Sequence, residues 1–245
     1  MSQPPALLAA ALAALFAAAP AGMPAKAASG CARDAMLVFD GSASMAEVGF
    51  DVSAPTRIEE ARQAVARAMP RIAPVRRVGL LTYGPGGADA CSGIALRFPP
   101  MADAAEAVTG GVVALRPNGL TPIAASVQAA ADVLGGEGIV VLVTDGNETC
   151  GGRPCALGGA LAQTAPGITV HVIGFRVEYD PFAWDSPEAG VYSGAASVAK
   201  CLSDQTGGLY VGTETVDELA AALEETLGCA LIGLRREKAA AVPYG

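Results

Sequence analysis

Oxygen-bearing side chains occur at three separated places in the sequence, each where an apolar run meets a loop or a helix. The stretch MLVFDGSASM runs from apolar residues into Asp40, and Ser42 and Ser44 follow at alternate positions. Asp145 ends a second apolar run, VLVTD, and Thr121 opens a helical pattern within GLTP. Carboxylate and hydroxyl oxygens without cysteine or histidine form the ligand set of a hard cation, above all Mg²⁺.

The spacing of these residues indicates how such a cation would be held. Ser42 and Ser44 are two residues apart, so both hydroxyls face the same side of an extended loop. Gly41 permits the chain to turn sharply off the strand. Two carboxylates and three hydroxyls leave a divalent cation under-neutralised, and Mg²⁺ usually keeps several waters. One water position is therefore open to a carboxylate from a partner.

Apolar runs and helical patterns alternate along the chain. Three runs lack strict alternation, which is typical of strands covered on both faces, and they span residues 35–40, 139–145 and 168–175. Shorter strand candidates lie at 77–84 and 208–213. The helical patterns span 56–72, 121–134 and 216–228. Their boundary signals are a capping box at Thr56 and Glu59, a cap at Thr121, and a stop at Gly228.

This alternation predicts an α/β fold, a doubly wound and mostly parallel sheet of about six strands with helices on both faces. Residues 93–98 follow a turn too short to hold a helix, so they predict one antiparallel strand at the sheet edge. In an open parallel sheet, ligands bind beyond the carboxyl ends of the strands. Asp40, Asp145 and Thr121 are expected to meet there.

The N-terminal residues have the composition of a targeting segment. An apolar run over 6–19 is followed by prolines and by Ala25 and Ala27, which predicts a signal peptide over 1–27. A retained membrane anchor is the alternative. The residues ASGC resemble a bacterial lipobox, which makes a lipid anchor at Cys31 the rival to soluble export. Soluble export to the periplasm or the medium is preferred, with one domain over 31–229 and a loose tail over 230–245.

Six cysteines follow the signal peptide, and an even number in an exported chain predicts three disulfides. Topology favours Cys31 with Cys229, because the last helix runs back towards the start of the first strand. The other four cysteines leave two pairings open. One joins Cys150 to Cys155 and Cys91 to Cys201, and the other joins Cys91 to Cys150 and Cys155 to Cys201.

Charge and the single histidine exclude other classes of site. The net charge of −8 argues against nucleic acid, whose phosphates require a basic surface. His171 lies between valines in an apolar run and has no second histidine to join it, so we expect a satisfied core residue. Glu148 lies in the loop after Asp145, and we expect it to be solvated.

The segments DGSAS, GLTP and VTDG resemble, in this order, the metal-ion-dependent adhesion site of von Willebrand factor type A domains. The resemblance covers residues from about 34 to about 229 and includes the antiparallel edge strand. It implies that Ser42 and Ser44 bind the metal directly and that Thr121 joins them when a ligand is present. It also implies that Asp40 and Asp145 act mostly through water.

A narrower resemblance links the chain to bacterial exported type A domains, which often keep paired cysteines after the last aspartate of the site. Together these resemblances imply a Mg²⁺-dependent protein-binding module of the bacterial cell envelope, with Mn²⁺ or Ca²⁺ as substitutes. Its partner would be a protein that offers Asp or Glu to the metal, and the domain alone would be a monomer. The resemblances name no partner.

Two other functions compete with this one. A phosphatase with Asp40 as nucleophile needs a second aspartate two residues later as general acid, and Ser42 occupies that place. No P-loop, nucleophile elbow or HExxH motif occurs either, so we expect no enzyme. The remaining alternative is a structural envelope component whose metal only stiffens the fold.

Overall fold

The computed structural model describes residues 31–48, 53–177, 188 and 199–229. The predicted signal peptide and the predicted tail lie outside the described residues. Within them, no helix is both long enough and apolar enough to cross a membrane.

Six strands form one sheet in the order β3-β2-β1-β4-β5-β6, which confirms the predicted fold class. All neighbouring strands are parallel except β2 and β3. β1 lies inside the sheet, and all six of its residues are buried. The strand bounds are β1 Ala35–Asp40, β2 Val78–Tyr83, β3 Ala95–Met101, β4 Glu137–Thr144, β5 Gly167–Phe175 and β6 Tyr210–Thr213.

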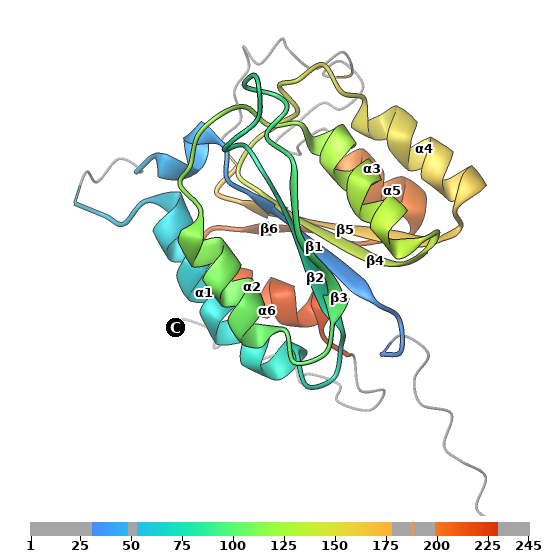
Figure 1. Cartoon of the computed structure of the whole chain (residues 1–245), viewed down its shortest axis with the longest axis horizontal. Coiled ribbons are helices and arrows are strands. Elements are labelled where there is room, and N and C mark those ends of the chain that lie inside the picture. The colour runs from blue at the N-terminus through green and yellow to red at the C-terminus, as the bar shows by residue number, and fades with distance from the viewer. Residues whose placement is uncertain (1–30, 49–52, 178–187, 189–198, 230–245) are drawn as a thin grey trace, which may run out of the picture.

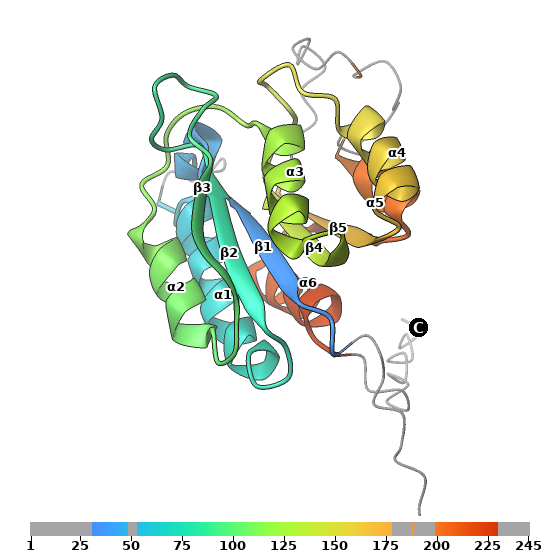
Figure 2. The ribbon, with the colours of Figure 1, turned by 45° about the vertical axis from the view of Figure 1, so that its right-hand side comes forward.

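Helices cover both faces of the sheet, as Figures 1 and 2 show. One apolar core joins one face to α1, α2 and α6, and a second core joins the other face to α3, α4 and α5. Alternate residues of β1 enter opposite cores, Leu37 the first and Val38 the second. The helices are η1 (a 3-10 turn) Ala43–Ala46, α1 Arg57–Ile72, α2 Ala105–Ala114, α3 Ile123–Leu134, α4 Pro154–Thr164, α5 Lys200–Thr206 and α6 Val216–Leu227.

The predicted edge strand is confirmed, since β3 pairs antiparallel with β2. It extends to Met101 and contains Pro99 and Pro100, which an edge strand tolerates although proline has no N–H to donate. The sequence did not indicate α2, α4 or α5. Paired glycines inside both α2 and α4 weaken the helical signal, and α5 has only seven residues.

Three disulfides form in the described structure, and the predicted Cys31–Cys229 pair is among them. The other two join Cys91 to Cys150 and Cys155 to Cys201, so the alternative with Cys150 bonded to Cys155 is wrong. The reason is that Cys155 enters α4, which packs against α5 and its Cys201. Because the sulfur of Cys31 is already bonded to Cys229, a lipid anchor at Cys31 is incompatible with this pairing.

A buried arginine, Arg76, reinforces the end of the sheet where β1 begins. The guanidinium of Arg76 donates to the carbonyl of Arg33 at 2.7 Å and to that of Gly228 at 3.0 Å. Burial lowers the pKa of Arg76. Together with the Cys31–Cys229 disulfide, these bonds tie the two ends of the domain to each other.

Candidate metal site at the carboxyl edge of the sheet

Asp40 is fully buried at the carboxyl end of β1. One carboxylate oxygen accepts a hydrogen bond from the Ser42 N–H at 2.8 Å, and the other accepts one from the Thr144 hydroxyl at 2.8 Å. The Tyr83 hydroxyl donates to Thr144 Oγ1 at 3.1 Å. Burial, followed by the charge of Asp40, raises the pKa of Tyr83 well above its usual value, so this donor stays neutral. Side chains at the ends of β2 and β4 thus fix the Asp40 carboxylate.

The hydroxyls of Ser42 and Ser44 lie 3.0 Å apart, and Ser44 donates to Asp145 Oδ1 at 2.8 Å. The chain leaves β1 at Gly41, where a Cβ would lie 2.9 Å from the Tyr83 carbonyl oxygen, so only glycine fits. The loop is not extended as expected, because η1 begins at Ala43. The two hydroxyls nevertheless share one side, and four of the five predicted residues form one hydrogen-bonded group.

The fifth residue, Thr121, is 5% exposed and is brought to this group through its backbone. Ala43 N–H donates to the Gly119 carbonyl at 3.1 Å, which sets the GLTP segment against the loop after β1. On the other side, Thr121 N–H donates to Thr149 Oγ1 at 2.9 Å. The expected cap role of Thr121 is wrong, because α3 begins at Ile123 and no side-chain hydrogen bond caps it from the preceding residue.

Glu148, and not Thr121, caps the N-terminus of α3. Its Oε2 accepts from the Ala124 N–H at 2.9 Å, and its Oε1 accepts from the Cys150 N–H at 2.8 Å. A carboxylate at a helix N-terminus is stabilised by the free N–H groups and the helix dipole. Glu148 is only 1% exposed, so the expectation of a solvated loop residue is wrong. No local pattern indicated this role, since Glu148 lies 24 residues from the helix position that it caps.

Arg57, at the start of α1, is a member of the site that the sequence analysis missed. Its guanidinium lies 3.1 Å from Asp145 Oδ2 and 3.3 Å from Glu47 Oε2, and the residue is 5% exposed. Burial and then the charge of Asp40 raise the pKa of the Asp145 carboxyl to about 7, although Ser44 and Arg57 oppose this shift. The Asp145 carboxylate therefore has too little positive charge around it, and a bound cation would supply that charge.

The donor set fits a hard divalent cation. Among the described residues, no three acidic, histidine or cysteine side chains gather to hold a metal. A cation between Asp40 and Asp145 would therefore depend on hydroxyls and water for its other ligands, as Mg²⁺ commonly does. A structural zinc site, which uses cysteine and histidine, does not fit these residues.

Comparison with known proteins agrees with this geometry. Residues 35–148 match the family model described as von Willebrand factor type A domain. The chain carries a type A domain. The match contains all three segments, from Asp40 through Thr121 to Asp145, and it confirms the predicted resemblance to this family.

Individual relatives are distant. The uncharacterized protein YwmD of Bacillus subtilis (strain 168) is 26% identical over 208 residues, covering 77% of this chain and 82% of the relative. The pilus adhesin SpaC of Lactobacillus rhamnosus GG shares the fold with a TM-score of 0.58 at 15% identity, over 80% of this chain and 30% of the adhesin. Proximal thread matrix protein 1 from the mussel byssus, with zinc in its metal-ion-dependent adhesion site, has a TM-score of 0.51 at 16% identity, over 81% and 46% of the two chains.

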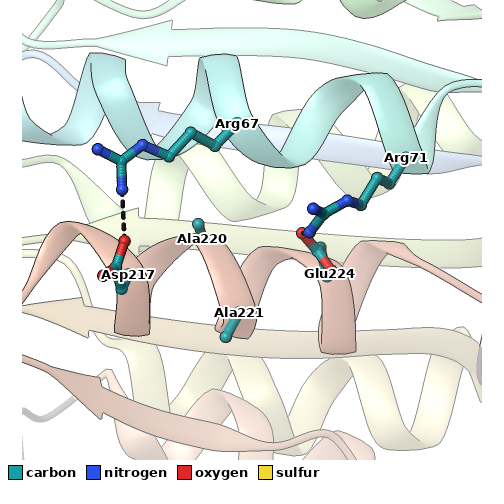
Figure 3. A pocket seen from close by; sticks show the side chains of 6 residues that line it. All are labelled: Arg67, Arg71, Asp217, Ala220, Ala221 and Glu224. Atoms are coloured by element: carbon teal, nitrogen blue, oxygen red, sulfur yellow. Dashed lines mark hydrogen bonds and ion pairs between the residues drawn. The ribbon is translucent and has the colours of Figure 1, made fainter.

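A groove between α1 and α6 also concentrates charged side chains. Figure 3 shows two arginines of α1 pointing towards two carboxylates of α6. Arg67 pairs with Asp217, and Arg71 lies 2.6 Å from Glu224. Because each arginine is matched by a carboxylate, the groove has no charge left for a ligand. Exposed pairs of this kind contribute little to stability, and we assign them to helix packing.

His171 is half-buried on β5, and its Nδ1 accepts a hydrogen bond from the Leu209 N–H at 3.0 Å. The expectation of a hydrogen-bonded histidine is confirmed, but His171 is half-buried and is not a core residue. Burial, with Arg33 and Arg76 adding to it, lowers the pKa of His171 to about 4, so the ring is neutral at pH 7.

This pKa predicts a specific loss of stability in mild acid. The folded pKa is lower than the unfolded value, so the stabilisation is complete above about pH 6.5 and is lost as the pH falls towards 4. Between pH 7 and pH 5 the wild type should lose roughly 1 kcal/mol more than His171→Asn, after allowance for the partial exposure of the ring. Urea unfolding of both proteins at both pH values measures the difference, and parallel losses would contradict the assignment.

Proposed function

We propose that this type A domain is a divalent-cation-dependent protein-binding module of the bacterial cell envelope, periplasmic or secreted and monomeric on its own. The observation that carries the proposal is that Asp40, Ser42, Ser44 and Asp145 form one hydrogen-bonded group. Of these residues, Asp40, Ser42 and Asp145 are only 0–3% exposed. Their oxygens lie at the sheet edge where ligands of open parallel sheets bind.

Each site residue has a proposed role. Ser42 and Ser44 would hold the cation directly, and Asp40 and Asp145 would hold it through water. Thr121 would join when a ligand is bound. Mg²⁺ is the proposed cation, and Mn²⁺ and Ca²⁺ are substitutes with the same oxygen preference. The zinc in the mussel protein's site supports a divalent ion in this place.

The charge of the site explains why the partner would offer a carboxylate. Three acidic side chains, Asp40, Asp145 and Glu47, surround the single positive charge of Arg57, so the metal-free site is acidic and repels an acidic partner. A divalent cation adds +2 and removes this excess of negative charge. An Asp or Glu of the partner would then complete the coordination shell of the cation.

Capture of envelope proteins on immobilised residues 28–245 tests the function. A protein retained in Mg²⁺, lost in EDTA and lost with Asp40→Ala is the expected result. Asp132→Ala, on the exposed side of α3, is the control and should retain the same protein. Identical sets of captured proteins under all conditions would contradict the proposal.

Thr121 separates this function from the alternative of a purely structural metal site. Thr121→Val keeps the side-chain volume and removes the hydroxyl, so we expect the captured partner to be lost while the melting temperature changes little. A structural role predicts the reverse, namely a lower melting temperature with the partner retained. Thermal unfolding in Mg²⁺, run beside the capture experiment, distinguishes the two.

An enzymatic role has no support at this site. A phosphatase with Asp40 as nucleophile requires a general acid two residues later. That position holds the Ser42 hydroxyl, which lies 3.0 Å from the Ser44 hydroxyl. We therefore propose binding and not catalysis.

A further inference from the structure

The Cys91–Cys150 disulfide joins two loops at the edge that carries the candidate metal site. One loop follows β2 and the other follows β4, and the two Cα atoms lie 5.6 Å apart. The GLTP segment with Thr121 passes between these loops and hydrogen-bonds to both of them.

The hydrogen bonds on either side come from the immediate neighbours of the bonded cysteines. Leu120 N–H donates to the carbonyl of Ala90, next to Cys91, at 2.8 Å. Thr121 N–H donates to Thr149 Oγ1 at 2.9 Å, and Thr149 N–H donates back to the Thr121 carbonyl at 3.1 Å. Leu120 and Thr121 are thus enclosed in a ring that the disulfide closes covalently.

Side-chain packing holds this segment less firmly than its backbone contacts do. The Leu120 side chain is 41% exposed, so it contributes little to either core. Gly119 has a φ of +76°, and a Cβ there would lie 2.2 Å from the Gly84 carbonyl oxygen, which shows how closely the segment approaches the loop after β2. The Ala43–Gly119 hydrogen bond holds the segment against the loop after β1, and its position otherwise depends on the separation of the two flanking loops.

We propose that the Cys91–Cys150 disulfide is the positioning element for Thr121, fixing the separation of the two loops so that the Thr121 hydroxyl is held ready at the site. This inference rests on the proposed function, because it concerns a residue of the proposed metal centre. Without the disulfide the two loops gain freedom, and binding must order them at a cost in affinity.

The chain supplies a matched control in its third disulfide. Cys155–Cys201 closes a loop of similar length, with a sequence separation of 46 residues against 59 for Cys91–Cys150. Loop-closure entropy depends weakly on length, so the two should stabilise the fold by similar amounts. Cys155–Cys201, however, joins α4 to α5 and does not enclose the GLTP segment.

The experiment measures Mn²⁺ binding by titration calorimetry in acetate buffer, whose carboxylate takes the partner's place at the cation and so brings Thr121 into its role, for residues 28–245 and two double variants. Cys91→Ser with Cys150→Ser should bind Mn²⁺ between about 10- and 100-fold more weakly, the usual range for losing support around a metal site. Cys155→Ser with Cys201→Ser should lower the melting temperature similarly and leave Mn²⁺ affinity unchanged. Equal Mn²⁺ affinity in both double variants and the wild type would overturn this inference but not the proposed function.

A second variant keeps the test decisive where the first pair of substitutions prevents folding. Thr149→Val retains every disulfide and removes the acceptor of the Thr121 N–H, so Mn²⁺ affinity should again fall. Unchanged Mn²⁺ affinity in Thr149→Val would overturn the inference. Failure of the wild type to bind Mn²⁺ is a separate result, which would overturn the proposed function and this inference with it.

Discussion

Replacing Arg57 with methionine is expected to lower the free energy of unfolding by about 3 kcal/mol in EDTA at pH 8. The guanidinium lies 3.1 Å from Asp145 Oδ2, and neither side chain is more than 6% exposed. Its removal leaves a buried carboxylate without its counter-ion, and the apolar part of methionine preserves most of the packing. At pH 6 the loss should be smaller, because the pKa of Asp145 is already raised to about 7 and the carboxyl takes up a proton.

Divalent cations should reverse much of this loss. The variant has one positive charge fewer beside the site, so Mg²⁺ should bind it more tightly and raise its melting temperature more than that of the wild type. Arg67→Met is the control, because Arg67 lies on the same helix in an exposed pair worth at most about 1 kcal/mol. Equal losses in the two variants, or no recovery with Mg²⁺, would contradict the role given to Arg57.

Replacing Asp40 with asparagine is expected to change metal affinity and stability in opposite directions. Mn²⁺ affinity should fall by about 100-fold, because one of the two carboxylates is lost and the water that it would hold loses its acceptor. The melting temperature in EDTA should rise, because the charge of Asp40 is one of the causes that raise the pKa of the buried Asp145.

Calorimetry with Mn²⁺ and thermal unfolding in EDTA measure the two effects on the same protein. Asp132→Asn, on an exposed helix position, should change neither quantity. A fall in both affinity and stability would mean that Asp40 mainly holds the loop after β1 in place. A rise in stability with weaker Mn²⁺ binding would show that the fold tolerates electrostatic strain at this edge in return for a cation site.

Most of the site could be predicted because its residues are tied to strand ends. Asp40 and Asp145 follow continuous apolar runs, and parallel strands place such ends at one edge. Arg57 and Glu148 could not be found in this way. Each acts on a residue far along the chain, Arg57 on Asp145 and Glu148 on Ala124, and no local period or spacing encodes such a contact.

The helices and strands, too, could be predicted only where the signal lies within a short stretch of sequence. Strands with long apolar runs and α1 with its capping box were predictable, and Glu59 Oε2 indeed accepts from the Thr56 N–H at 2.8 Å. The glycine pairs of α2 and α4 hide helices that packing against the sheet stabilises. The Cys91–Cys150 pair depends on the positions of two loops, and the Cys155–Cys201 pair depends on the packing of α4 against α5, two helices that the sequence did not indicate.

The Cys31–Cys229 disulfide also determines how the domain responds to mechanical force. Tension applied through the segments that precede Cys31 and follow Cys229 passes through one covalent bond, so it bypasses the sheet and does not pull the strands apart. A pull applied at Asp40 and resisted at Cys31 would run along β1 instead. That strand is hydrogen-bonded to β2 on one side and to β4 on the other, so the pull loads both rows of hydrogen bonds in shear. A domain connected in this way resists extension between Cys31 and Cys229, and a pull at Asp40 would be carried by a fully buried strand.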